Sequence, residues 1–104
     1  MLPFDSDCEI TNITKDSFGV ETKGTPFPSE CRINEDSGIS TGKLGNQFNY
    51  STLYFLPPGV NIKEGDKIRT TKFKGVAVTE SEKLVKKAIT CGVFLASHME
   101  VYVV

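Results

Sequence analysis

The fold is decided by LPPGVNIKEGDKIR, residues 56–69, which follows an aromatic, β-prone run at residues 50–55. Pro57 cannot donate a hydrogen bond to a sheet ladder, and Pro58 restricts the backbone of the residue before it. A strand that enters this stretch therefore ends at the two prolines.

The second half of the same stretch returns the chain to a sheet. Val60 and Ile62 offer apolar anchors for a crossing segment, and Gly65 can adopt the positive φ that a tight turn requires. The Asp66 side chain can bond the backbone of that turn. The pattern predicts a strand, an anchored crossing, a turn and a second strand, which we place in the middle of a small β-barrel.

Length and composition predict one mainly β domain over residues 1–104. A chain of 104 residues can bury roughly two-thirds of its unfolded surface. Hydrophobic residues make up 38% of it, and nine glycines and five prolines interrupt the chain often, which favours short strands over long helices. We expect a small β-barrel or sandwich of about six to seven short strands.

Alternating polar and apolar residues indicate where the strands lie. The clearest is the last, in which Met99, Val101 and Val103 share one face. A hairpin is expected around Lys74 and Gly75, with Val76 and Val78 pointing inward. The expected strands cover residues 7–14, 20–22, 29–34, 50–56, 67–73, 75–80 and 98–104.

Two segments do not follow this pattern. Residues 79–91 place Leu84, Val85, Ala88 and Ile89 on one helical face after a capping-box signal, so local pattern favours one short helix. The alternative is a long hairpin arm. Residues 35–49 have three apolar side chains without a steady period, and we expect a long inserted loop, which in so small a domain is usually functional or disordered.

The charge is small but unevenly distributed. Net charge is −1, which argues against a dedicated nucleic-acid-binding protein. Residues 1–52 contain eight acids and four bases, a balance of −4, whereas residues 53–104 contain five acids and eight bases, a balance of +3. Such a domain can stack head to tail on copies of itself, or the two halves can simply be solvated faces.

The cysteines and the N-terminal residues indicate the compartment. Three widely spaced cysteines do not resemble a disulfide framework, and the first residues do not resemble a secretory signal. No apolar run approaches the roughly 18 residues that cross a bilayer. We expect a soluble protein that is made in a cytoplasm and has no membrane partner.

No motif in the sequence predicts catalysis, a cofactor or a metal. The glycine-rich residues 38–43 lack the spacing of a phosphate-binding loop. Cys8, Cys31, Cys91 and His98 contain no pair at the two-to-four spacing that structural zinc sites favour, so buried apolar cysteines are expected. His98 is the single histidine, and no nucleophile can be assigned to it. We expect no enzyme activity, no cofactor and no metal.

The densest basic run has three interpretations. The simplest is a solvated strand face, and the second is a charged interface. The third is an oligonucleotide-binding face, but only Phe73 lies within the run, whereas stacking platforms usually present several aromatics. The run consists of Lys63, Lys67, Arg69, Lys72 and Lys74.

Three segments together resemble a known family. They are residues 56–68, the glycine–valine step KGVAV at residues 74–78, and the terminal strand HMEVYV at residues 98–103. The chain is similar here to the small head–tail connector proteins of tailed bacteriophages, the stopper or head-completion proteins that are often called minor capsid proteins. The match covers roughly a third of the chain, and the segment 79–97 departs from it.

The resemblance implies a structural virion protein made in the host bacterial cytoplasm and placed in the neck, at the head–tail interface. Such β-barrels form a homo-oligomeric ring, commonly of about twelve subunits, between the portal or adaptor protein and the tail or tail-terminator protein. A loop from each subunit helps to seal the channel that holds the packaged double-stranded DNA. The chief alternative is an oligonucleotide-binding-like barrel that binds single-stranded nucleic acid. If the resemblance transfers, the channel loop is residues 35–49, with Ile39, Lys43, Leu44 and Phe48 as its working side chains.

Overall fold

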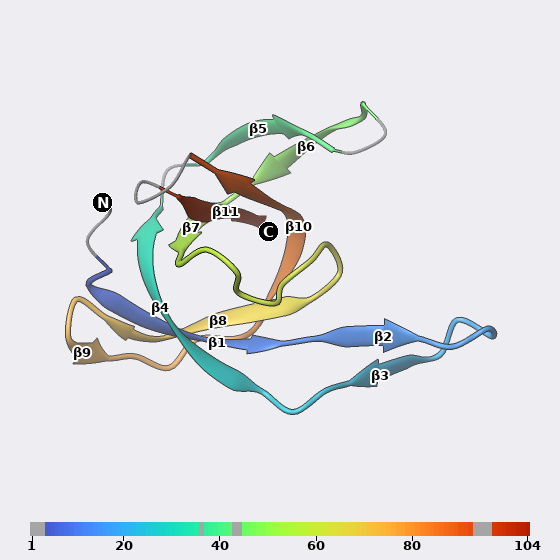
Figure 1. The fold of residues 1–104 in the computed structure, drawn as a ribbon, viewed down its shortest axis with the longest axis horizontal. Coiled ribbons are helices and arrows are strands. Elements are labelled where there is room, and N and C mark those ends of the chain that lie inside the picture. The colour runs from blue at the N-terminus through green and yellow to red at the C-terminus, as the bar shows by residue number, and fades with distance from the viewer. Residues whose placement is uncertain (1–3, 36, 43–44, 93–96) are drawn as a thin grey trace.

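A computed structural model describes residues 4–35, 37–42, 45–92 and 97–104, and these residues form eleven β-strands and no helix. Six antiparallel strands close into a barrel in the order β1-β4-β7-β11-β10-β8, because β8 also pairs with β1, and β9 adds to β8 (Figure 1). The strands of this sheet are β1 (Ser6–Thr11), β4 (Phe27–Asn34), β7 (Thr52–Leu56), β8 (Lys67–Phe73), β9 (Val76–Ala77), β10 (Lys83–Cys91) and β11 (His98–Val103). The predicted mainly β class and small barrel are confirmed.

Side chains alternate between the barrel interior and its outer face, as strand geometry requires. In β11 Met99, Val101 and Val103, which were predicted to share one face, are buried. At the centre of the core, the Tyr54 hydroxyl and the Thr70 hydroxyl lie 2.8 Å apart, so the polar atoms of both residues are partnered inside the barrel. The core is completed by Cys8, Ile10, Cys31, Leu56, Ile62, Ile68 and Val85.

The stretch that joins β7 to β8 has the predicted form. Gly59 and Gly65 adopt φ values of +83° and +94°. Ile62 is buried and Val60 packs on the core, so both serve as anchors for the crossing. The Asp66 N–H donates to the Lys63 carbonyl at 3.1 Å, which closes a tight turn with Gly65 at its third position.

Gly65 provides a direct test of this turn. We expect Gly65→Ala to cost about 1–2 kcal/mol of unfolding free energy, because the added Cβ meets open space and the cost is therefore backbone strain at positive φ. Gly42→Ala is the matched control, since Gly42 lacks a positive φ and its Cβ would make ordinary contacts. Urea denaturation of both variants measures the difference, and equal losses would contradict the explanation.

The helix expected within residues 79–91 is wrong, because Lys83–Cys91 form the strand β10. This strand pairs with β11 along most of its length and with β8 at its start, and it buries Val85 in the core. The capping-box signal consists of Thr79 and Glu82, and Glu82 instead pairs with Lys23 at 3.0 Å. A helix here would leave β8 and β11 as open edges, so the pairing of the barrel overrides the local helical pattern.

The expected irregular loop at residues 35–49 is also wrong in its local structure. Its described residues contain a regular hairpin of β5 (Gly38–Thr41) and β6 (Gln47–Tyr50). The hairpin around Lys74 and Gly75 is confirmed as β8 and β9, but Val76, which was predicted to point inward, is 65% exposed. The strand β9 pairs only with β8 and lies outside the six strands of the closed barrel, so both of its residues are exposed.

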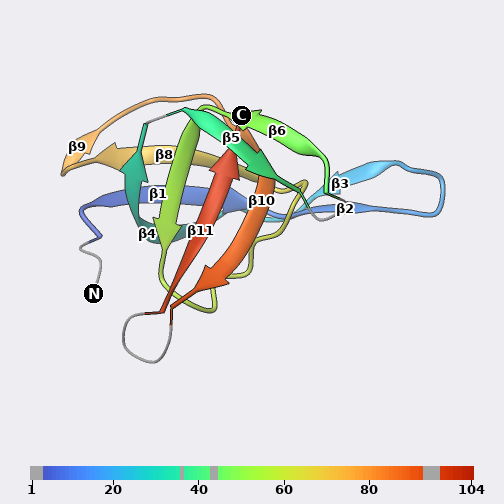
Figure 2. The ribbon, with the colours of Figure 1, turned by 90° about the horizontal axis from the view of Figure 1, so that it is seen from above.

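Two hairpins stand outside the barrel wall. The strands β2 (Ile13–Lys15) and β3 (Glu21–Lys23) form an arm that projects far from one end of the barrel, and the β5–β6 hairpin lies over the wall near β10 and β11 (Figures 1 and 2). Among the residues that the structure describes, no helix is long and apolar enough to cross a membrane.

Candidate functional site

The β5–β6 hairpin holds the side chains predicted to work in a channel. Ile39 on β5 is 66% exposed. Phe48 on β6 is half-buried, with its ring edge-on to the Tyr102 ring at 6.4 Å between centroids. Lys43 and Leu44 lie outside the described residues. Of the two described members, Ile39 is therefore the one that presents an apolar side chain to solvent.

Aromatic contacts attach this hairpin to the outer face of the barrel. The Tyr50 and Tyr102 rings meet at nearly right angles with centroids 4.9 Å apart, and the Lys87 ammonium lies 5.4 Å from the centre of the Tyr102 ring. Lys87 also donates to the Ser40 hydroxyl at 3.4 Å. These contacts fix the base of the hairpin and leave Ile39 on a supported element.

The predicted basic run is divided by the fold. The Lys63 ammonium lies 2.7 Å from Asp66, and the Arg69 guanidinium lies 3.0 Å from Glu9. Lys67 is half-buried at the start of β8, whereas Lys72 and Lys74 are exposed at its other end. Two of the five charges are thus neutralised by carboxylates, and the rest lie at opposite ends of one strand.

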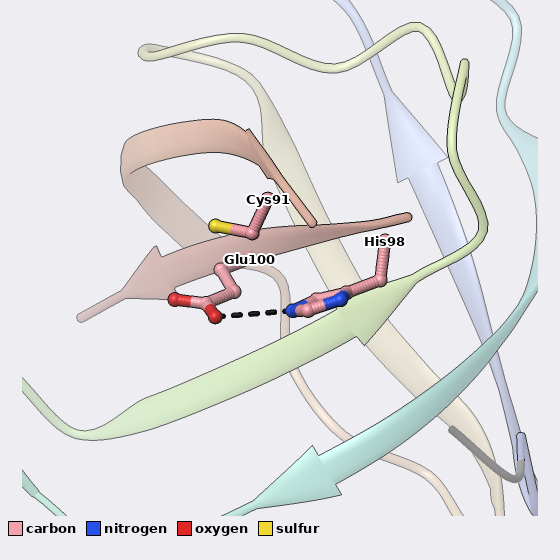
Figure 3. Close-up of side chains that lie close together, drawn as sticks. All are labelled: Cys91, His98 and Glu100. Carbon is pink, nitrogen blue, oxygen red and sulfur yellow. Dashed lines mark hydrogen bonds and ion pairs between the residues drawn. The ribbon is translucent and has the colours of Figure 1, made fainter. Parts of the chain in front are cut away.

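A cluster that no motif predicted lies on the β10–β11 ladder. Cys91 is the cross-strand partner of His98, and Glu100 follows two residues later on the same face of β11. One ligand atom from each of the three side chains lies within 4.8 Å of the others (Figure 3). Among the described residues, this is the one group of three or more His, Cys, Asp or Glu side chains whose ligand atoms lie this close together. The His98 Nε2 lies 3.1 Å from the Glu100 carboxylate, and the Tyr102 hydroxyl donates to the other Glu100 oxygen at 3.0 Å.

The pKa shifts in this cluster follow from its surroundings. Burial acts to raise the pKa of Glu100, but hydrogen bonds from His98, Tyr102 and Cys91 outweigh it and hold the pKa below its usual value. Burial and the neighbouring Glu100 raise the pKa of the Cys91 thiol. Burial, followed by the hydrogen bond to Glu100, raises the pKa of Tyr102 to about 12. Cys91 is therefore a protonated thiol at neutral pH and a poor nucleophile.

The four residues considered together from the sequence separate into two groups. Cys8 and Cys31 are buried inside the barrel, where a hydrogen bond with Cys8 and burial raise the pKa of Cys31. Cys91 and His98 lie on the outer face, where Glu100 joins them. The sequence signal for Glu100 was its position two residues after His98 in an alternating strand, which places both side chains on one face.

The comparisons with known proteins provide no assignment. No protein-family model, curated protein or solved structure matches this chain.

Proposed function

We propose that this chain is a structural virion protein of a tailed bacteriophage, a head–tail connector of the stopper type. The observation that carries the proposal is a small closed barrel from which two hairpins with exposed apolar side chains project. A closed barrel offers few free strand edges for assembly, and exposed apolar side chains on such appendages are suited to contact neighbours. The resemblance at residues 56–68 and 98–103 supports the same assignment.

The β2–β3 arm is suited to hold a neighbouring copy of the chain. Phe18 and Val20 at its tip are 89% and 59% exposed. The Asp16 carboxylate accepts hydrogen bonds from the Phe18 and Val20 N–H groups at 2.8 and 2.9 Å, which shapes the tip and presents both side chains. In a ring, one arm on each subunit would meet the next subunit head to tail, so weak contacts repeat around the circle.

The β5–β6 hairpin is the proposed channel element. It is attached to the barrel through Phe48 and Tyr50, and it exposes Ile39. Symmetry mates of Ile39 would meet one another above the DNA, and the ring would contact the portal or adaptor protein on one side and the tail or tail-terminator protein on the other. Repeated hairpins can close a passage together while each remains able to swing aside.

Electron cryo-microscopy of the phage neck tests the proposal. We expect density for this chain as a ring between portal and tail, with the β2–β3 arm on the adjacent subunit and the β5–β6 hairpin toward the channel. Absence of the chain from every virion component would overturn it.

The rival function is binding of single-stranded nucleic acid by the isolated barrel. Lys72 and Lys74 are exposed beside Phe73, but Lys63 and Arg69 are already paired with carboxylates. Titration of a fluorescent oligonucleotide separates the two functions, because the rival requires tight binding by the monomer that weakens steeply with salt. The connector proposal expects only weak binding.

Polar substitution of the arm tip is expected to reduce incorporation of the chain into virions several-fold. The double variant Phe18→Ser, Val20→Ser removes exposed apolar contacts, so the free energy of unfolding of the isolated chain should change by less than about 0.5 kcal/mol. Val76→Ser is the matched control, because Val76 is 65% exposed on β9, away from the arm. Quantitative mass spectrometry of particles from a complemented knockout phage measures incorporation, and equal incorporation of both variants would contradict the role of the arm.

A further inference from the structure

We propose that Cys91, His98 and Glu100 form a binding site for a transition-metal ion, with zinc as the ion that the donors suit best. A thiolate sulfur, an imidazole nitrogen and a carboxylate oxygen are the three donor types that zinc accepts in proteins. Spacing along the chain predicted no such site, because the ligands are brought together by strand pairing. This inference does not depend on the connector function.

The β10–β11 ladder positions all three donors. Cys91 and His98 face each other across the two strands, and Glu100 lies on the same face one step farther along β11. Two ligands of a tetrahedral zinc ion lie roughly 3.3–3.8 Å apart, given zinc–ligand distances of about 2.0–2.3 Å. The three donor atoms already lie within 4.8 Å of one another, so modest side-chain rotations would complete the geometry (Figure 3).

Neighbouring side chains prepare two of the donors. The Tyr102 hydroxyl donates to one Glu100 oxygen at 3.0 Å, and the other Glu100 oxygen faces the His98 Nε2 at 3.1 Å. The ring of Phe55 packs beside the His98 ring with centroids 5.7 Å apart, which restricts the imidazole. Such supporting contacts orient metal ligands in characterised sites.

Protons must leave when the metal binds. Cysteine binds zinc as the thiolate, so zinc replaces the proton of the Cys91 thiol, and one H⁺ is released to solvent as the zinc–sulfur bond forms. Three protein ligands leave one position of a tetrahedral ion open to water or to a group from a partner.

The experiment uses the purified full chain without a polyhistidine tag, because a tag would add competing imidazoles. Zinc chloride is titrated by calorimetry and by competition with a chromogenic chelator, and cobalt(II) serves as the spectroscopic probe. We expect one ion per chain, a sulfur-to-cobalt charge-transfer band and a higher melting temperature in the presence of zinc. No binding, or cobalt spectra without the sulfur band, would overturn the proposal.

Variants identify the ligands. Cys91→Ser, His98→Asn and Glu100→Gln should each weaken zinc binding more than about tenfold. Glu80→Gln is the matched control, a carboxylate outside the cluster that pairs with Lys83, and it should leave the affinity unchanged. Unchanged affinity in Cys91→Ser would assign the ion to another site and overturn the proposal.

Alkylation keeps the test independent of whether these variants fold. Cys8 and Cys31 are buried and Cys91 is partly exposed, so iodoacetamide should modify Cys91 first in the native protein. Zinc should protect Cys91 from modification, and prior modification should abolish zinc binding. Equal alkylation rates with and without zinc would contradict the site.

Discussion

Replacing Asp66 with alanine is expected to lower the free energy of unfolding by about 3–5 kcal/mol. The carboxylate is fully buried, and one oxygen accepts from the Ile13 N–H at 2.9 Å and the Lys63 ammonium at 2.7 Å. The other accepts from the Asn12 side-chain amide at 2.8 Å and the Lys63 N–H at 3.0 Å. This one side chain joins the turn before β8 to the chain between β1 and β2.

The size of the effect comes from the donors that the alanine variant leaves behind. The Ile13 N–H is buried with its acceptor, and an unsatisfied buried donor costs about 1–3 kcal/mol. Glu64→Ala is the matched control, because Glu64 is an exposed carboxylate two residues earlier in the same turn. Urea denaturation measures both variants, and a loss below about 1 kcal/mol for Asp66→Ala would show that water or a rearranged turn replaces the carboxylate.

The same residue predicts how stability depends on pH. Burial acts to raise the pKa of Asp66, but the bonds from Lys63, Ile13 and Asn12 outweigh it, and the pKa lies below its ordinary value. The stabilisation that the ionised Asp66 carboxylate provides is therefore complete above the pKa of an aspartate in the unfolded chain, about 3.9. It is lost as the pH falls through the lower pKa of Asp66 in the folded protein. As the pH falls from 5 into the acid range, wild type should lose more stability than Asp66→Asn, because only wild type has a carboxylate at position 66 that becomes protonated. Parallel curves of unfolding free energy against pH for the two proteins would assign the acid sensitivity to other carboxylates.

The elements that could be predicted from the sequence depend on local constraints. Pro57 and Pro58 end a strand in any surroundings, and Gly65 provides a positive φ without help from distant residues. The terminal strand has a strict alternation with three buried residues on one face. These features remain the same whichever partner strands the chain finds.

The segment that was mispredicted depends on distant partners. Leu84, Val85, Ala88 and Ile89 satisfy a helical period, but only β8 and β11 decide that the backbone of this segment pairs in a sheet. The same error concealed the cluster on the ladder. Once residues 83–91 are assigned to a strand that turns back into β11, Cys91 becomes a neighbour of His98, and Glu100 follows by alternation.

Shortening the β5–β6 hairpin is expected to have the second large effect, a loss of DNA from phage heads. This prediction rests on the proposed connector function. Replacing residues 41–47 with Asn-Gly keeps the paired residues Ser40 and Phe48 and joins them by a two-residue turn that suits a hairpin. The contacts of Phe48 with Tyr102 and of Ser40 with Lys87 remain, so the barrel should keep its stability. We expect phage heads assembled with this variant to lose most of their packaged DNA and most infectious titre.

Nuclease-protected genome copies per particle measure the leak, and the amount of the chain per particle shows whether the ring is present. Ile39→Asp tests the same element without shortening it and should cause a partial leak, because charged symmetry mates repel one another. Val76→Asp is its matched control, since Val76 is equally exposed on β9 and should retain DNA. Full retention with the shortened chain present at wild-type amounts would remove the plug role while leaving the ring in place, whereas absence of the chain from wild-type particles would remove both.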